Sequence, residues 1–427
     1  MVAKFLEKLL LSIDISKSFL GVIVEGIKTK NGDNGIQRQR VFDSLRQIAI
    51  FFNNSKLGRL ENQVETTDKE RVTVAFLGTE FTKSIGHILS GITCRLMAKE
   101  LGLDSRHYVI IGNRHANSHL FHKYLKPKLP WLNLSDSSTD LFELANQSSM
   151  EKVGNVRIAD RNLSLFNATA NLNWEWYKIK ARDNVLNLHE EDLVIGERYL
   201  ESKGLTEGDW FVVLHPRWTG QGLADSRNVK IDSYRETVKW IIERGGYVFK
   251  IGLPDGESMN FSHEKYVDYS NSVDRTEQLD IFLTAQARLF IASSSGLSHL
   301  AMALGTPVLH TNITNMGVYP FYPKSRFIPK IKTNKAIANS NFLNDLNNQL
   351  YDVDNTSSNS LSVFIRDNTS QEILEATKEM FAFIESNFAE QDVLIQDLAS
   401  LVSKRNNYPT SLMSSSFLAN HASYFDF

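Results

Sequence analysis

The sequence contains a single cysteine, Cys94, among its 427 residues. One thiol cannot form an intrachain disulfide, and it cannot supply the set of cysteine ligands of a structural zinc site. Such a chain fits a reducing compartment, so we expect a cytoplasmic protein.

No run of apolar residues is long enough for a transmembrane helix, which needs about 18 or more. The first 26 residues, MVAKFLEKLLLSIDISKSFLGVIVEG, hold apolar runs that Lys8 and Asp14 interrupt, and no clear cleavage site follows. We therefore expect a leading helix packed on the core rather than a signal peptide. The alternative is a helix on the membrane surface, which would attach the protein peripherally to the inner face of the membrane.

The sequence also lacks an excess of charge, because 47 basic and 49 acidic residues give a formal net charge of −2. A nearly neutral chain has no long-range field that attracts nucleic acid, so we expect no nucleic-acid partner. Two nucleotide-binding fingerprints, GxGxxG and GxxxxGK[ST], are missing as well. Hydrophobic residues make up 42% of the chain, which is typical of a globular protein, and the length predicts two domains.

Strand and helix patterns alternate in two series along the chain, separated by a weakly patterned stretch from about residue 127 to residue 184. The first series has strands at 71–78 and 106–113 with a helix at 87–103 between them. In the second series the strand candidates are 210–216, 247–252, 266–270, 288–293 and 306–312, and the helix candidates are 190–205, 231–245, 277–287, 296–305 and 369–388.

This alternation is typical of α/β domains with parallel, helix-covered sheets. We expect a Rossmann-like domain at 1–185, a second at 186–370, and C-terminal helices at 371–427. Ligands of open parallel sheets bind beyond the carboxyl ends of the strands, so the predicted site is a cleft between the two domains.

The stretch IASSSGLSHLAMALGTPVL, residues 291–309, places three small residues where a strand gives way to a helix: Ser294, Ser295 and Gly296. Free backbone N–H groups and the helix dipole attract anions at such a point, and a glycine lets a ligand approach closely. The pattern suits a diphosphate. Capping of the helix by a serine is the alternative, and it needs no ligand.

Polar and charged residues also gather at the ends of two other strand candidates: His215, Arg217, Asp225, Arg227 and Asn228 in and after LHPR, and Lys250 in YVFKIG. Two arginines about ten residues apart in one loop can converge on phosphate oxygens. The alternative is a surface loop with solvated arginines.

In the first domain, Gly78 and Gly86 bracket a loop between a strand and a helix. Glu80 and His87 are its titratable residues, and either could act as a general base. An ordinary surface or capping role is the alternative for each.

The segment SSGLSHLAMALGTPVL resembles the DTGxxHLAAALGxPxV signature of heptosyltransferases, which are glycosyltransferases of the two-domain GT-B kind. In that motif the Thr, the Gly and the helix start bind the donor diphosphate, and Ser295, Gly296 and His299 occupy matching positions. Ser294 stands where that family has an Asp that contacts the donor sugar, which is a departure from the pattern.

The segments LHPRWTG, DSRNVKIDSY and GGYVFKIG resemble a family of uncharacterised bacterial glycosyltransferases from surface-polysaccharide gene clusters. The HxR of this chain, His215 and Arg217, is also similar to that of fucosyltransferases, whose Arg holds the GDP diphosphate. The resemblance extends from about Leu186 to the C-terminus.

These resemblances imply a GT-B fold whose C-terminal helices cross back to the first domain. They also imply transfer of a sugar from a GDP- or UDP-linked donor to a glycan, lipid-linked or protein acceptor. No DxD-type pair stands where a metal would be needed, so we expect neither a metal nor another cofactor. A nucleotide-sugar epimerase or hydrolase and a non-catalytic binding protein remain alternatives.

We expect Glu80, His87 and Arg217 to be catalytic. The predicted donor-binding residues are His215, Arg217, Asp225, Arg227, Asn228, Lys250, Ser294, Ser295, Gly296, His299 and Asn312.

Overall fold

The computed structural model divides the chain into two compact units, residues 1–169 and 170–427. The predicted domain boundary, after residue 185, lies further along the chain. The leading helix expected in the first 26 residues lies outside the described residues. The structure describes residues 72–77, 84–103, 106–111, 117–133, 155–158, 161–180, 182, 184–219, 227–254, 256–314, 322–334, 363–388 and 411–421.

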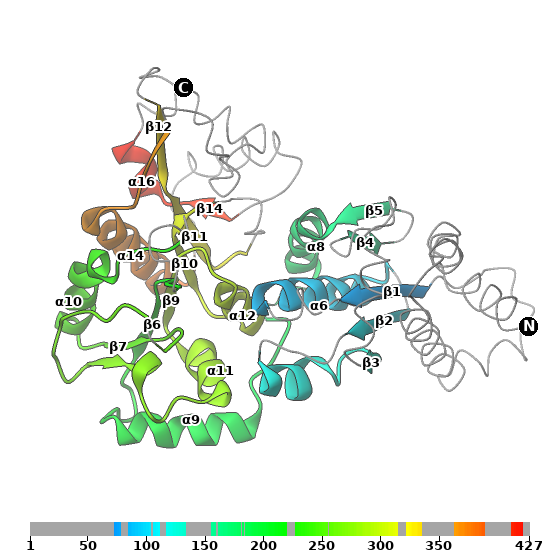
Figure 1. Ribbon diagram of the computed structural model, residues 1–427, viewed down its shortest axis with the longest axis horizontal. Coiled ribbons are helices and arrows are strands. Elements are labelled where there is room, and N and C mark those ends of the chain that lie inside the picture. Colours follow the sequence, from blue (N-terminus) through cyan, green and yellow to red (C-terminus); the bar gives the residue numbers. More distant parts are fainter. Residues whose placement is uncertain are drawn as a thin grey trace, which may run out of the picture. The chain divides into compact units, whose positions relative to one another are not determined.

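The first unit holds a parallel three-stranded sheet in the order β1-β2-β3 (Figure 1). Its first two strands, and the helix α6 between them, confirm the predicted strand–helix–strand pattern. The weakly patterned stretch that follows contains a third strand, an antiparallel pair and a long helix, none of which was predicted. The elements are β1 Val72–Leu77, α6 Ile85–Glu100, β2 Arg106–Ile111, the π-helical turn Leu120–Leu125, β3 Trp131–Asn133, β4 Asn155–Ile158 and β5 Arg161–Ser164. Helix α8, Leu165–Lys180, begins in the first unit and continues into the second.

The second unit is built on a seven-stranded parallel sheet in the order β14-β11-β10-β9-β6-β7-β8 (Figure 1). All five strands predicted here are present, so the α/β class with a parallel sheet is confirmed. The edge strand β14 and its neighbour β11 were not predicted. The strands are β6 Phe211–His215, β7 Tyr247–Lys250, β8 Tyr266–Asp268, β9 Leu289–Ala292, β10 Val308–Ile313, β11 Ser325–Pro329 and β14 Leu412–Met413.

Helices cover both faces of this sheet: α10, α14 and α16 pack together on one face, and α9, α11 and α12 on the other (Figure 1). A separate antiparallel pair, β12 with β13, precedes α14. The remaining elements are α9 Glu190–Ser202, the 3-10 turn Ile231–Tyr234, α10 Arg235–Glu243, the 3-10 turn Tyr269–Asn271, α11 Glu277–Gln286, α12 Leu297–Leu304, β12 Ile331–Asn334, β13 Val363–Arg366, α14 Ser370–Glu385 and α16 Ser415–Asn420.

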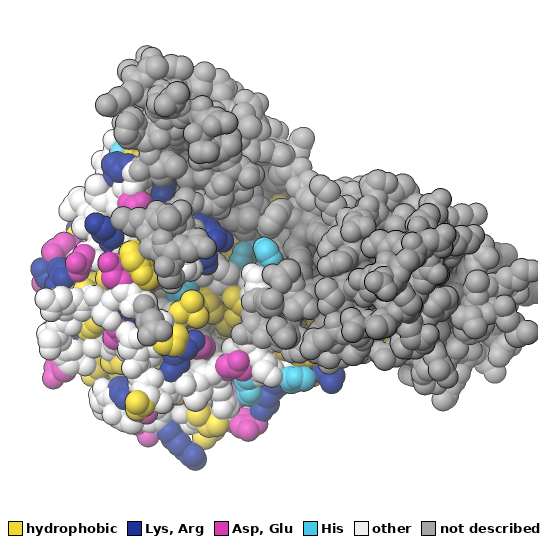
Figure 2. All heavy atoms as spheres, viewed as in Figure 1, with side chains coloured by type: hydrophobic (Ala, Val, Ile, Leu, Met, Phe, Trp, Pro, Cys, Tyr) yellow, Lys and Arg dark blue, Asp and Glu magenta, His cyan; other side chains and the backbone are white. Residues whose placement is uncertain are grey.

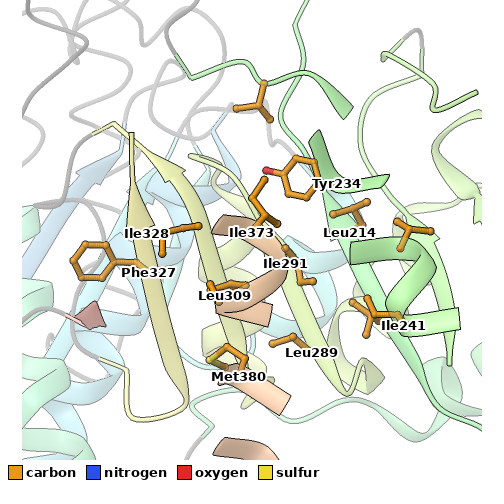
Figure 3. Packing of buried hydrophobic residues seen from close by; sticks show 14 of the residues in the cluster. Leu214, Tyr234, Ile241, Leu289, Ile291, Leu309, Phe327, Ile328, Ile373 and Met380 are labelled. Atoms are coloured by element: carbon orange, nitrogen blue, oxygen red, sulfur yellow. The ribbon is translucent and has the colours of Figure 1, made fainter. Parts of the chain in front are cut away.

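The main core lies between the sheet and the layer of α10 and α14 (Figure 3). Alternate residues of each strand point into it, as Leu289 and Ile291 of β9 do, because side chains of a strand alternate between its faces. Ile373 and Met380 of α14 meet them from the helix layer, and all four are fully buried. The purely apolar contact explains why these strands read as near-continuous hydrophobic runs in the sequence.

The C-terminal helices of the described chain belong to this same core. Thr369 and Glu372 form a capping box at the start of α14. The Glu379 carboxylate of α14 accepts from the backbone N–H groups of Ser415 and Ser416, at 2.9 and 3.0 Å, and so caps α16. These contacts lie within the second unit, and the prediction that C-terminal helices return to the first domain stays a prediction.

Helix α9 approaches α11 so closely that only glycine fits at the contact. A Cβ atom on Gly196 would lie 2.0 Å from Cγ of the buried Phe282 ring. We therefore expect Gly196→Val to lower the free energy of unfolding by about 2 kcal/mol or more through overpacking. Denaturant unfolding of the purified protein measures this change.

The matched control is Glu197→Val, which places the same side chain on the exposed side of the same helix. It is expected to change the stability by no more than about 0.5 kcal/mol, because it creates no clash. Equal stabilities of the two variants would contradict the close packing of α9 on α11.

The visible surface of the second unit carries basic and acidic side chains intermixed (Figure 2), which agrees with the small net charge of the chain. Within the part of the chain that the structure describes, no helix is long and apolar enough to cross a membrane.

Candidate functional site

Four neighbouring parallel strands bring the predicted site residues to one edge of the second sheet. His215 ends β6 and pairs in register with Ala292 at the end of β9. Lys250 ends β7 and lies beside Leu214 of β6. Because all these strands run in the same direction, their carboxyl ends meet at the same edge, as the sequence predicted.

His215 is held between two defined partners. Its Nδ1 lies 3.1 Å from the Ile251 carbonyl oxygen, and its Nε2 lies 2.7 Å from Oγ of Ser295. A carbonyl oxygen only accepts, so Nδ1 carries the proton and Nε2 accepts from the Ser295 hydroxyl. Burial is the largest effect and lowers the pKa of His215, the Ile251 bond raises it, and the charges of Arg217 and Lys250 lower it, so that the pKa is about 4. The ring is therefore neutral at pH 7.

The three serines after β9 have three different roles. Ser293 Oγ accepts from the backbone N–H of Arg217 at 2.8 Å. Ser294 is buried, and its Oγ donates to the Asn312 carbonyl at 3.3 Å and accepts from the Thr314 N–H at 3.1 Å. The hydroxyl of Ser294 is thus used within the fold, while that of Ser295 lies beside His215.

Helix α12 begins at Leu297 with Gly296 as its N-cap residue, and no side chain caps it by the usual hydrogen bond. The Leu297 N–H lies 3.4 Å from Oγ of Ser295, which is a long contact. The first backbone N–H groups of α12 therefore point toward the carboxyl edge of the sheet, where Ser295, Gly296 and His215 lie. This arrangement agrees with the prediction of an anion-binding helix start.

Arg217 and Arg227 lie at the neck of one loop. The carbonyl of Arg217 accepts from the N–H of Val229 at 3.1 Å. Asn228 closes the neck with bonds to the main chain and hydroxyl of Thr219, of which two measure 3.1 Å. Arg217 follows the end of β6, and the bonds of Asn228 to Thr219 hold the two sides of the loop together.

Asp225, a predicted donor-binding residue between Arg217 and Arg227 in the sequence, lies outside the described residues.

Lys250 is paired within the fold. Its Nζ lies 3.2 Å from Oδ1 of Asp268 and donates to Ser270 Oγ at 2.7 Å. Burial opposes ionisation of Asp268, but hydrogen bonds from Ser270 and Ser258 and the charge of Lys250 hold the pKa of that carboxyl below its usual range. The charge of Lys250 is therefore already balanced by Asp268. Sequence reasoning missed this residue because the predicted strand, 266–270, continued past it, whereas β8 ends there.

Asn312 is fully buried, and its backbone is in the left-handed region, with φ of 53°. Its N–H donates to Asn368 Oδ1 at 2.5 Å, and its Oδ1 accepts from the N–H of Asn368 at 2.7 Å. These bonds join β10 to the segment before α14. They account for the side-chain oxygen of Asn312 and give no support to the predicted contact with a donor.

His299 lies half-buried on α12. Burial of His310, the larger effect, and the nearby His299 together lower the pKa of His310 to about 3. His310 is fully buried on β10. The predicted contact of His299 with the donor stays a prediction.

In the first unit, His87 is exposed on the first turn of α6. Glu80 lies outside the described residues, between β1 and α6 in the sequence. The described residues include no group of three or more His, Cys, Asp or Glu placed to hold a metal ion.

The geometry brings together an arginine-bearing loop, a neutral histidine, a serine hydroxyl and a helix start. Direct hydrogen bonds join them: Arg217 to Ser293, and His215 to Ser295. Guanidinium groups and backbone N–H groups are the usual protein ligands of phosphate oxygens. The arrangement can therefore bind an anion with several oxygens at this edge of the sheet.

No family model matches this chain, and no curated protein does. Among solved structures, the chain is similar to a family 9 glycosyltransferase from Veillonella parvula, with a TM-score of 0.48 and 10% identity over 75% of this chain and 99% of the other.

Two further similar structures are heptosyltransferases from E. coli. The ADP-heptose lps heptosyltransferase II has a TM-score of 0.44 and 11% identity, over 74% of this chain and 100% of the other. WaaC with ADP-2-deoxy-2-fluoro heptose has a TM-score of 0.35 and 12% identity, over 60% of this chain and 92% of the other.

These are enzymes of the class that the SSGLSHLAMALG motif resembles. All three TM-scores lie below 0.5, a level at which likeness does not establish a shared substrate or mechanism. The resemblance to fucosyltransferases stays a prediction.

Proposed function

We propose that the chain is a glycosyltransferase that moves a sugar from a nucleotide diphosphate sugar to an acceptor hydroxyl. One observation carries the proposal: the Arg217 loop is bonded to Ser293, in the segment that leads from β9 to α12, at the carboxyl edge of a parallel sheet. This is the edge where such sheets bind nucleotides. The acceptor would be a glycan, a lipid-linked saccharide or a protein, in the assembly or modification of bacterial surface glycans.

The reaction breaks the bond between the anomeric carbon and the diphosphate, so negative charge grows on the leaving phosphate. Arg217 and Arg227 would stabilise that charge, together with the N–H groups at the start of α12. Lys250 would contribute less than the sequence suggested, because Asp268 already balances it. A base from the first unit, Glu80 or His87, would take the proton of the acceptor hydroxyl.

A thermal-shift screen tests the proposal, with ADP, GDP, UDP and CMP as probes and EDTA in the buffer. ADP is included because two of the similar proteins are named for ADP-heptose or were solved with an analogue of it. A nucleoside diphosphate that binds only the folded protein at 100 times its Kd should stabilise it by about 2.7 kcal/mol. EDTA should not reduce the shift, because side chains and N–H groups would hold the phosphates.

Turnover of the donor without an acceptor separates the alternatives. An epimerase or hydrolase would consume the matching nucleotide sugar alone, whereas a glycosyltransferase would need an acceptor for rapid turnover. Binding without turnover under any condition would favour a non-catalytic binding protein. The proposal is wrong if none of the four nucleotides stabilises the protein with or without magnesium or manganese.

A further inference from the structure

We propose that the donor diphosphate binds together with one proton, which His215 takes up as the Ser295 hydroxyl turns from His215 to a phosphate oxygen. This inference rests on the proposed function, because it requires a diphosphate at the start of α12. It makes His215 a positioning residue, which acts on the ligand through Ser295.

The described bonds show which way the hydroxyl points before a ligand binds. The Ile251 carbonyl holds the proton on Nδ1 of His215, so Nε2 has a lone pair that faces Ser295 Oγ at 2.7 Å. Ser295 has one hydroxyl proton and donates it to Nε2. One lone pair of Oγ faces the Leu297 N–H at 3.4 Å, and the other is left for a group that approaches the start of α12.

A phosphate oxygen in that place would meet a second acceptor. Two oxygen lone pairs facing each other repel, whereas a hydroxyl that donates to an ionised phosphate makes a strong charge-assisted bond. The Ser295 hydroxyl therefore gains by turning toward the phosphate. After that rotation, Nε2 of His215 faces a lone pair of Ser295 Oγ with no proton between them. His215 is only 7% exposed, so water does not readily replace the lost bond.

Such an unsatisfied buried acceptor is costly, by about 1–3 kcal/mol. A proton from the solvent on Nε2 removes that cost, since His215 can then donate to Ser295 Oγ. No covalent bond other than the new N–H bond forms, and the serine keeps its own proton. The imidazolium also carries a positive charge toward the incoming anion.

Burial of His215, the largest effect, and the charged groups near it explain why the proton arrives only with the ligand. Among the described residues, Arg217 faces it from the loop after β6 and Lys250 from β7, and both disfavour a third positive charge. Lys250 is paired with Asp268 of β8, while β9 and the start of α12 present Ser293 and Ser295. A bound diphosphate offsets these positive charges and raises the pKa of His215.

The pH dependence follows from the two pKa values. His215 has a pKa of about 4 in the ligand-free protein and a higher one in the complex. Binding is therefore strongest below the lower value, weakens by up to about tenfold per pH unit as the pH rises between the two, and levels off above the higher value.

Isothermal titration calorimetry measures the proton directly. ADP-glucose, GDP-mannose and UDP-glucose are the probes, because their diphosphates do not titrate between about pH 5 and pH 8, so any proton taken up is bound by the protein. Each titration is repeated at pH 6 in two buffers of different ionisation enthalpy. We expect uptake of about 0.5–1 proton per probe bound.

Two variants distinguish the relay from a merely structural role. His215→Gln can still bond to Ser295 but does not titrate, and Ser295→Ala removes the hydroxyl. Both should bind the probe with no proton uptake at pH 6 and with nearly pH-independent affinity, and their thermal unfolding checks that they are folded.

Binding without uptake by the wild-type protein overturns the relay and leaves the proposed function standing. Uptake that persists in both folded variants also overturns it, because another group then titrates. If none of the three probes binds, the proposed function fails and the relay fails with it.

Discussion

Replacing Arg217 with alanine is expected to lower kcat/KM for sugar transfer by about 30- to 1000-fold, or about 2–4 kcal/mol of transition-state stabilisation. The side chain lies at the neck of its loop, where a guanidinium group can reach phosphate oxygens from beside the start of α12. The fold should survive the change. Two bonds of Arg217, from its N–H to Ser293 and from its carbonyl to Val229, are made by the backbone and do not depend on the side chain.

Steady-state kinetics with the donor found in the screen measures this loss. Arg217→Lys should fall between wild type and Arg217→Ala, because lysine keeps the charge but loses the bidentate geometry. The control is Arg198→Ala, which removes an exposed guanidinium from α9 and should leave kcat/KM unchanged. Near wild-type kcat/KM for Arg217→Ala would remove this residue from the site.

The strands at the centre of the second sheet could be predicted because burial on both faces leaves a continuous apolar run with polar residues at its ends. Edge strands carry a weaker signal. Only two residues of β14, Leu412 and Met413, pair with β11, and no pattern in so short a segment identifies a strand. Its pairing depends on the capped helix α16 behind it.

Helix α8 was missed for a different reason. Its sequence, LFNATANLNWEWYKIK, is rich in asparagine and aromatic residues, which have modest helix propensity. Burial of Leu172 and Trp176 stabilises the helix by tertiary packing, which a local pattern does not reveal. Long-range packing of this kind limits what sequence alone can predict.

At the candidate site, the sequence predicted where residues lie but not which way their side chains point. Parallel strands fix the position of a residue that ends a strand, so the placement of His215 and Lys250 at one edge followed from the pattern. Polar groups at such an edge can also satisfy one another. Asp268 balances the charge of Lys250, and Asn368 bonds to Asn312. The partners in each pair are too far apart in the sequence for one motif to include both.

Glu80→Gln is expected to lower the rate of transfer by at least about 100-fold, while binding of the donor, measured by calorimetry, is unchanged. Glutamine keeps the size and polarity of the side chain but cannot take a proton. Glu80 stands in the connection between the carboxyl end of β1 and the start of α6, the part of a parallel sheet that carries catalytic groups. A carboxylate there also suits the positive charge that develops on the sugar.

His87 is the competing base, because it is exposed on the first turn of α6 only a few residues away. The two can be separated: if Glu80→Gln transfers normally and His87→Ala does not, the base is His87. Glu100→Gln makes the same chemical change at the exposed far end of α6 and should have no effect. If both Glu80→Gln and His87→Ala transfer at the wild-type rate, the base lies outside this connection. A group from elsewhere in the chain would then activate the acceptor, because the acceptor hydroxyl must still lose its proton when it bonds to the transferred sugar.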